Sequence, residues 1–332
     1  MLIVLSMLMG ALLGFAAHRA GLCTVKAVAE VLTTRRANFL WSFAKSSLWV
    51  MALSALAAAV PLEIGLRHWP LSGLSVAGGM LFGLGAGING GCTFSTLSRL
   101  MDGNLNVLAT VLMWPVGIVS ALTLMSGLRD ATPANVPAGQ LPLWLSVPIG
   151  LFVLWEAALL VRRLAQSGSL RHSIGAPIYT LSAGAALVGG ANAVLLLAWG
   201  PWSFTGTMLC VLEASTVARC GASQSVPLLV LAAALVGMAF SSWQRGSFRL
   251  QRLRAREAMR HAGGGLLMGI GAMFIPGGND GLILFGIPSL SPHAIPAYLG
   301  ILAGVAIALS AMRMMGRVIP SVHCEGDICR TT

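Results

Sequence analysis

The chain has 332 residues, of which 56% are hydrophobic and only 9% are charged. Soluble domains carry about 25% charged residues, so this composition excludes an ordinary soluble protein and predicts an integral membrane protein. The net charge of +11 does not indicate nucleic-acid binding, because basic and aromatic residues are not interleaved in a patch.

The apolar segments predict an all-α membrane protein in contact with lipid. A helix needs about 20 mainly apolar residues to cross a bilayer, and on this measure the chain has nine spans, several of which run into short glycine-rich or hydroxyl-rich half-segments. The N-terminus is apolar from Met1 with no basic region, so we expect no cleaved signal peptide. The spans are centred on residues 1–17, 38–60, 74–91, 105–126, 141–161, 177–200, 226–242, 263–277 and 293–312, and the half-segments are 18–30, 92–102, 203–216 and 279–290.

The lysines and arginines predict how the chain is oriented. If the C-terminus is cytoplasmic, fifteen of the 21 basic residues lie in cytoplasmic loops, and only Arg67 and Arg129 lie outside. Cytoplasmic loops of membrane proteins are rich in Lys and Arg. Nine spans then place the N-terminus outside and the C-terminus in the cytoplasm.

The half-segment at 18–30 contains a cysteine between two cations, in the sequence HRAGLCTVK. A cation within the membrane is costly and usually faces a pathway or a partner. Arg19 and Lys26 therefore predict attraction of an anion beside Cys23, which is followed by Thr24. The alternatives are an arginine that extends to the membrane surface and a cysteine that serves as a small apolar side chain.

The stretch 78–104 has the same features in a longer form. Its apolar part is rich in glycine and breaks at Gly90-Gly91, directly before Cys92-Thr93. Small residues at this spacing let helices pack closely in a membrane. A break frees backbone polar groups that lipid cannot satisfy, so it must be packed in protein or line a polar path. We expect Cys92 and Thr93 to line such a path.

A weak internal repeat relates the two halves of the chain. The segment 79–93, GMLFGLGAGINGGCT, aligns with 265–280, GLLMGIGAMFIPGGND, and places Cys92 opposite Asn279. The predicted topology makes the two copies run in opposite directions. Inverted repeats with interrupted helices are typical of transporters, whose site lies where the repeats meet. We therefore predict a first repeat at 1–140, a connector at 141–172, a second, inverted repeat at 173–316 and a cytoplasmic tail at 317–332.

These motifs resemble those of a known family. Gly21-Leu22-Cys23-Thr24, Gly90-Gly91-Cys92-Thr93 with Arg99 following, and the second-half Gly-Gly motif are similar to the YeeE/YedE sulfur-transport family of thiosulfate-uptake permeases in the bacterial inner membrane. The resemblance implies an hourglass-shaped helical protein whose short helices meet at the waist. It also implies that thiosulfate passes along cysteine thiols, two of them Cys23 and Cys92, without enzymatic chemistry or a cofactor.

The second half departs from the family pattern. Where the family has a third cysteine, this chain has Asn279, followed by Asp280. Asparagine can donate N–H bonds to an oxyanion but lacks a polarisable sulfur. An ionised Asp280 would repel an anion, so it must be protonated, paired or turned away. The candidate path residues are Arg19, Cys23, Thr24, Lys26, Cys92, Thr93, Gly278, Asn279 and Asp280.

The sequence leaves three functions open. The leading hypothesis is a permease for thiosulfate or a related sulfur oxyanion. A membrane sulfurtransferase that hands sulfur to a soluble carrier is the second, and a soft-metal permease that uses some of the 16 methionines is the third. The tail cysteines, Cys324 and Cys329, are either free thiols of a frayed terminus or a sulfur-accepting site for a soluble cytoplasmic carrier. The cysteine spacing predicts no zinc site, and we expect no metal.

Overall fold

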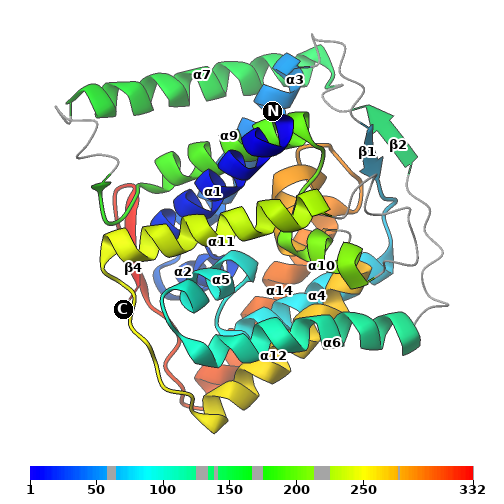
Figure 1. The fold of residues 1–332 in the computed structure, drawn as a ribbon, viewed down its shortest axis with the longest axis vertical. Coiled ribbons are helices and arrows are strands. Elements are labelled where there is room, and N and C mark those ends of the chain that lie inside the picture. Colours follow the sequence, from blue (N-terminus) through cyan, green and yellow to red (C-terminus); the bar gives the residue numbers. More distant parts are fainter. Residues whose placement is uncertain are drawn as a thin grey trace.

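The fold is a bundle of long helices into which several short helices are inserted (Figure 1). The computed structural model describes residues 1–57, 65–124, 134–137, 141–166, 175–212, 225–275 and 277–331. Each of the nine predicted spans coincides with a helix. These helices are α1 (Leu2–Ala20), α3 (Asn38–Ala57), α4 (Gly73–Asn89), α6 (Leu108–Leu124), α7 (Leu143–Gln166), α9 (Leu181–Ala198), α11 (Ser225–Arg245), α12 (Ala255–Phe274) and α14 (Ala294–Met314).

The helices have the length and hydropathy of a multi-pass membrane protein. Within the described ranges, seven helical segments are long and apolar enough to cross a membrane, and α12 with the segment that follows it is an eighth, bent by 45°. Helix α4 has 17 residues, somewhat fewer than the about 20 that cross a bilayer at right angles. The chain is therefore a multi-pass membrane protein.

Short helices lie at all four predicted half-segments. They are α2 (Thr24–Thr34), α5 (Thr93–Met101), α10 (Phe204–Leu212), and α13 (Gly278–Gly281) with the π-helical turn η3 (Leu282–Gly286). A further short turn, η1 (Leu105–Val107), follows α5. The end of the predicted half-segment 203–216 lies outside the described residues.

Equivalent glycines of the two aligned segments make equivalent contacts. A Cβ at Gly83 would lie 2.1 Å from the backbone oxygen of Ile301 on α14, and a Cβ at Gly269 would lie 2.2 Å from that of Trp114 on α6. No real side chain tolerates such distances, so only glycine allows these helices to pack so closely. Helix α4 thus packs on α14 as α12 packs on α6, and α4 and α12 also pack on each other.

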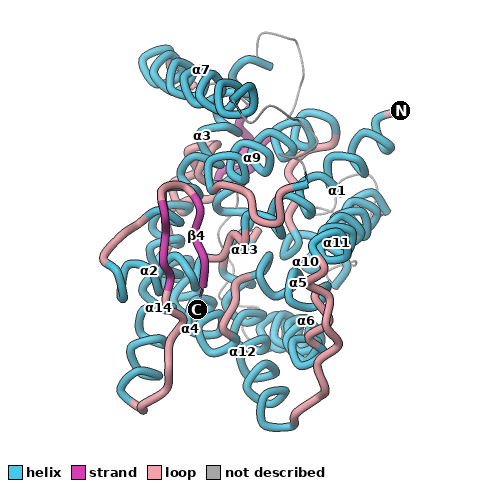
Figure 2. Tube along the Cα trace, turned by 90° about the vertical axis from the view of Figure 1, so that its left-hand side faces the viewer, coloured by secondary structure: helices cyan, strands magenta, loops and turns pink. Residues whose placement is uncertain are grey.

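Helices α4 and α12 run antiparallel. The early residue Gly78 of α4 meets the late residue Gly271 of α12, and Gly85 near the end of α4 meets Gly264 near the start of α12. Helix α1 likewise packs on α11 as α3 packs on α9. Helix α7, the predicted connector, lies along one edge of the molecule in both Figure 1 and Figure 2.

The loops are divided between two ends of the bundle. At one end β1 (Gly65–His68) pairs with β2 (Ala134–Pro137). At the other end the loop after α5 pairs with the basic loop after α11, where the backbone N–H of Arg249 donates to the carbonyl of Asp102 over 2.8 Å. The basic loop after α11 lies at this second end, where the backbone N–H of Gln251 also donates to the carbonyl of Gly103 over 2.9 Å.

The tail contradicts the expectation of a frayed terminus with free thiols. Strands β3 (Val322–Glu325) and β4 (Ile328–Thr331) form an antiparallel hairpin, and Cys324 and Cys329 are joined by a disulfide across it. Figure 2 shows the hairpin beside α2 and α14, and β3 contacts α2. The physical reason is that Val322 is fully buried against the helical core. The strands then place the two cysteines opposite each other.

Candidate functional site

The two motif cysteines occupy the same structural position in two different helix breaks. Helix α1 ends at Gly21 with φ 60°, and α4 ends at Gly90 with φ 76°. In this left-handed conformation glycine is strongly favoured. Each cysteine then lies in extended backbone directly before a short helix, Cys23 before α2 and Cys92 before α5. The shared Gly…Cys-Thr pattern therefore encodes a helix stop, a turn and a new helix start.

The two thiols meet inside the protein. Cys23 and Cys92 are 0% and 1% exposed, both are free of disulfides, and their side chains are neighbours. The Cys23 sulfur also lies near the backbone N–H of Lys26, and the Cys92 sulfur near those of Thr24 and Ser95. These N–H groups belong to the first turns of α2 and α5, and N–H groups at a helix start favour negative charge.

Two buried hydroxyl groups lie beside this pair. Thr93 is fully buried, yet its Oγ1 has no hydrogen-bond partner among the described residues. The buried hydroxyl of Tyr298 on α14 lies next to Thr24 and the two cysteines. A buried hydroxyl without a partner is costly, so the Thr93 hydroxyl has a free hydrogen-bonding capacity inside the protein. Tyr298 is not among the residues predicted from the sequence, although it is one of only two tyrosines and lies in an apolar span.

The second-half break supplies Asn279 to the same site. Gly277 and Gly278 adopt φ 83° and 65°, and α13 follows. The Thr24 hydroxyl donates to Asn279 Oδ1 over 3.2 Å, so the two halves of the chain meet here. Because Oδ1 is thereby occupied, the Nδ2 group of Asn279 carries the remaining donors.

Asp280 is turned away from the cysteines. Its carboxylate accepts the backbone N–H of Phe204 over 2.7 Å and the hydroxyl of Thr205 over 3.1 Å. These groups begin α10, so Asp280 caps that helix. The carboxyl group is thus engaged by the start of α10, as expected of a side chain that is turned away from the path. Gly278 packs against Thr205, where a Cβ would lie 2.4 Å from the Thr205 hydroxyl.

Two cations flank the thiols. Lys26 is partly exposed, and its Nζ would lie 3.4 Å from a Cβ at Gly21. Arg99 at the end of α5 donates to the carbonyl of Asn89 over 3.2 Å. The charges of both act on Cys23. Lys26 therefore lies close to Cys23, and Arg99 is a second nearby cation that was not among the predicted path residues.

Arg19 is placed differently from the prediction. Its guanidinium donates to Ser241 over 3.0 Å, to Gln244 over 2.6 Å and to the carbonyls of Gly175 and Ala176. It also lies 5.0 Å from the centre of the Phe15 ring. The side chain is therefore committed to holding α1, α11 and the 175–176 segment together, and we leave it out of the path.

Asn89 holds the loop that presents Cys92. Its Nδ2 donates to the carbonyl of Gly91 over 2.9 Å and to the Thr96 hydroxyl over 2.7 Å. Its Oδ1 lies 2.7 Å from the Thr110 hydroxyl and 2.7 Å from His261 Nδ1. Asn89 is fully buried and thereby joins α4, α5, α6 and α12. No local sequence pattern indicates this role, because the partners come from distant segments.

Comparison with known proteins identifies the family. A family model described as sulphur transport matches residues 19–307. This range contains Cys23, Cys92, Asn279 and every other candidate path residue. No curated protein matches the chain significantly. Because the family match covers most of the sequence, the chain belongs to the sulphur transport family and is a transporter of sulfur compounds.

Proposed function

We propose that the chain is a permease for thiosulfate or a closely related sulfur oxyanion, which passes between Cys23 and Cys92. The observation that carries this proposal is the pair of facing buried thiols, each at the start of a short helix. Thiosulfate has a polarisable terminal sulfur and three charged oxygens. Thiols are weak S–H donors and polarisable partners for such a sulfur, while hydroxyl and amide groups donate to oxygen.

The surroundings of the thiols favour an anion that does not stay bound. The helix starts of α2 and α5 and the cations Lys26 and Arg99 compensate negative charge. Within the described residues Lys26 forms no ion pair, so no fixed carboxylate neutralises it. The groups nearest the path, two thiols and the hydroxyls of Thr93 and Tyr298, are uncharged donors that bind weakly. A path needs such a combination of attraction and easy release.

The proposal includes the arrangement of the chain in the membrane. The antiparallel α4 and α12 and the matched contacts of Gly83 and Gly269 support two inverted repeats. The enrichment of the predicted cytoplasmic loops in Lys and Arg supports a bacterial inner-membrane protein whose C-terminus is cytoplasmic. That orientation would place the tail hairpin where a soluble sulfur-carrier protein can reach it.

Uptake into vesicles tests the proposal. The purified chain is reconstituted and supplied with radiolabelled thiosulfate, with sulfite, sulfate and Cu(I) as competitors. We expect thiosulfate uptake in the wild type and its loss in Cys92→Ala and Cys23→Ala, with normal insertion of both variants. Ser120→Ala is the matched control, because Ser120 is partly exposed on α6 and its hydroxyl donates to the carbonyl of Val116 in the same helix.

Two results would reject the proposal. Near-normal uptake by both cysteine variants would show that the thiols do not line the path. Thiosulfate labelled separately on its two sulfur atoms distinguishes a permease from a sulfurtransferase. A permease delivers both labels to the vesicle interior in one molecule, whereas a sulfurtransferase retains the terminal sulfur on a cysteine and releases sulfite.

A further inference from the structure

The tail hairpin is fixed to the body of the protein at its turn. The backbone N–H of Leu181 donates to the carbonyl of Asp327 over 2.8 Å, and that of Ser182 donates to Asp327 Oδ1 over 3.2 Å. Arg163 on α7 forms an ion pair with the same carboxylate over 2.9 Å. Asp327 thus binds the start of α9, and the hairpin has a defined position over α2.

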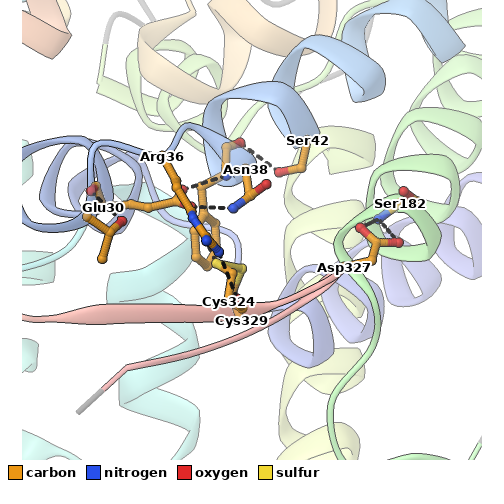
Figure 3. Close-up of a disulfide and its surroundings, with 10 residues drawn as sticks. Glu30, Arg36, Asn38, Ser42, Ser182, Cys324, Asp327 and Cys329 are labelled. Carbon is orange, nitrogen blue, oxygen red and sulfur yellow. Dashed lines mark hydrogen bonds between the residues drawn. A yellow bond between two sulfur atoms is a disulfide. The ribbon is translucent and has the colours of Figure 1, made fainter.

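In this position the two tail cysteines lie next to the buried carboxylate of Glu30 (Figure 3). Glu30 on α2 is fully buried. Its Oε1, the Cys324 sulfur and the Cys329 sulfur all lie within 4.8 Å of one another. Both cysteines are half-buried, so solvent reaches the group.

The Glu30 carboxylate is held rigidly. The side-chain amide of Asn38 donates to Oε1 over 2.7 Å, and the backbone N–H of Phe39 donates to Oε2 over 2.9 Å. Hydrogen bonds of this kind orient the carboxylate ligands of metal sites. They also leave lone pairs of Oε1 free to face the sulfur atoms.

The disulfide leaves the contact between oxygen and sulfur incomplete. Glu30 Oε1 lies 3.4 Å from the Cys324 sulfur. A sulfur in a disulfide has no proton to donate, so two acceptors face each other in a partly buried place. A thiol proton or a metal cation between them would remove this conflict.

We propose that the reduced chain binds a zinc ion through Glu30, Cys324 and Cys329. Two thiolates and one carboxylate, with a fourth position left for water, are a ligand set suited to Zn²⁺. Zinc–sulfur distances of about 2.3 Å and zinc–oxygen distances of about 2.0 Å in a tetrahedron place sulfur and oxygen about 3.5 Å apart. The observed 3.4 Å between Glu30 Oε1 and the Cys324 sulfur already matches this edge.

Zinc binding and the disulfide exclude each other. An added dithiol reduces the Cys324–Cys329 bond, passing two electrons and two protons to the sulfurs and becoming a disulfide itself. The zinc ion then displaces the two thiol protons, and the sulfurs separate to about 3.8 Å around it. Three negative ligands and a divalent cation leave one negative charge, which the neighbouring Arg36 partly offsets; its guanidinium donates to the Cys324 carbonyl over 3.4 Å.

Cobalt titration of the full-length chain in detergent tests the site. After reduction and anaerobic removal of the dithiol, the chain should bind one equivalent of Co²⁺. It should show thiolate-to-cobalt charge-transfer absorption and tetrahedral visible bands that Zn²⁺ abolishes. The oxidised chain should show neither. Cys324→Ser and Cys329→Ser should lose the charge-transfer signal, and Glu30→Gln should weaken binding by about tenfold or more.

Two controls separate this site from the remainder of the chain. His323→Ala changes an exposed neighbour of Cys324 and should bind Co²⁺ like the wild type. The double variant Cys23→Ala/Cys92→Ala should also bind one equivalent of Co²⁺. Metal binding would then be independent of the residues proposed for transport. The proposal is overturned if the reduced chain binds no equivalent of Co²⁺, or if Cys324→Ser and Cys329→Ser leave the spectrum unchanged in folded protein.

Discussion

The two Gly-Gly breaks of the chain both contain glycine in the left-handed conformation, but the polar groups that follow them are used differently. After Gly90-Gly91, the thiol of Cys92 faces Cys23, and the Thr93 hydroxyl has no partner within the described residues. After Gly277-Gly278, Asn279 accepts a hydrogen bond from Thr24, and Asp280 caps α10. A helix break inside a membrane thus creates polar groups, but the neighbouring helices decide whether these groups serve a path or the scaffold.

Under the proposed function, this difference explains how the second half tolerates a carboxylate close to the path. Asp280 is fully buried, and both of its carboxyl oxygens accept hydrogen bonds from the first residues of α10. The carboxyl group therefore interacts with the scaffold. Under the proposed function, the same arrangement leaves Asn279 to offer its amide N–H groups toward the path. Asn279 then supplies N–H donors at the position where the family resemblance implies an S–H donor.

The largest effect is expected where the two halves are most alike. Gly83→Val and Gly269→Val each drive a side chain into the backbone of a neighbouring helix. Overpacking of this kind costs about 1–3 kcal/mol or more, so both variants should lose most of their folded yield in detergent. Gly150→Val is the control, because a Cβ there meets nothing within 4 Å. A large difference between Gly83→Val and Gly269→Val would contradict the equivalence of the halves.

A smaller effect is expected at the unpartnered hydroxyl of the first break. Thr93→Val keeps the shape and removes the donor. A lost hydrogen bond to a charged ligand costs about 1.5–3 kcal/mol, which is about a tenfold to hundredfold loss of affinity for thiosulfate. The variant should fold as well as the wild type, since no protein group loses a partner. Unchanged transport kinetics would show that Thr93 does not meet the substrate.

Substitutions of Asn279 distinguish whether the second break contributes to the path or only to the scaffold. Asn279→Ala should weaken apparent thiosulfate affinity by about tenfold, measured as the concentration dependence of uptake. Asn279→Cys restores the residue that the family resemblance implies and should keep thiosulfate transport, or improve it relative to sulfite. If Asn279→Ala transports with unchanged affinity and selectivity, the residue only completes the break and supports Thr24.

The smallest effect on transport is expected at Asp280. Asp280→Ala removes the cap of α10, and lost caps cost about 0.5–2 kcal/mol, so the thermal midpoint in detergent should fall. Asp280→Asn retains a hydrogen-bond acceptor, so its thermal midpoint should fall less. Neither variant should change the preference for thiosulfate over sulfite among the molecules that remain folded. A gain in anion uptake by Asp280→Asn would place the carboxylate on the path instead.

The sequence alone determined the class of the molecule and most of its elements. Long apolar segments with few charges can fold only as membrane helices, because lipid satisfies no backbone polar group. Glycine pairs and the Gly…Cys-Thr pattern marked the places where these helices stop, since a left-handed turn strongly favours glycine. Those local rules were sufficient to predict α2, α5 and α13 and to select Cys23 and Cys92.

Only the tertiary structure decided which polar groups face each other. Arg19 is predicted for the path because a cation in a membrane needs a partner, but its partners turned out to be Ser241, Gln244 and two carbonyls of distant segments. For the same reason, the sequence could not predict the roles of Tyr298, of Asn89, or of the group formed by Glu30 and the tail cysteines. Their partners are separated from them along the sequence, and no local spacing records which helices will pack together.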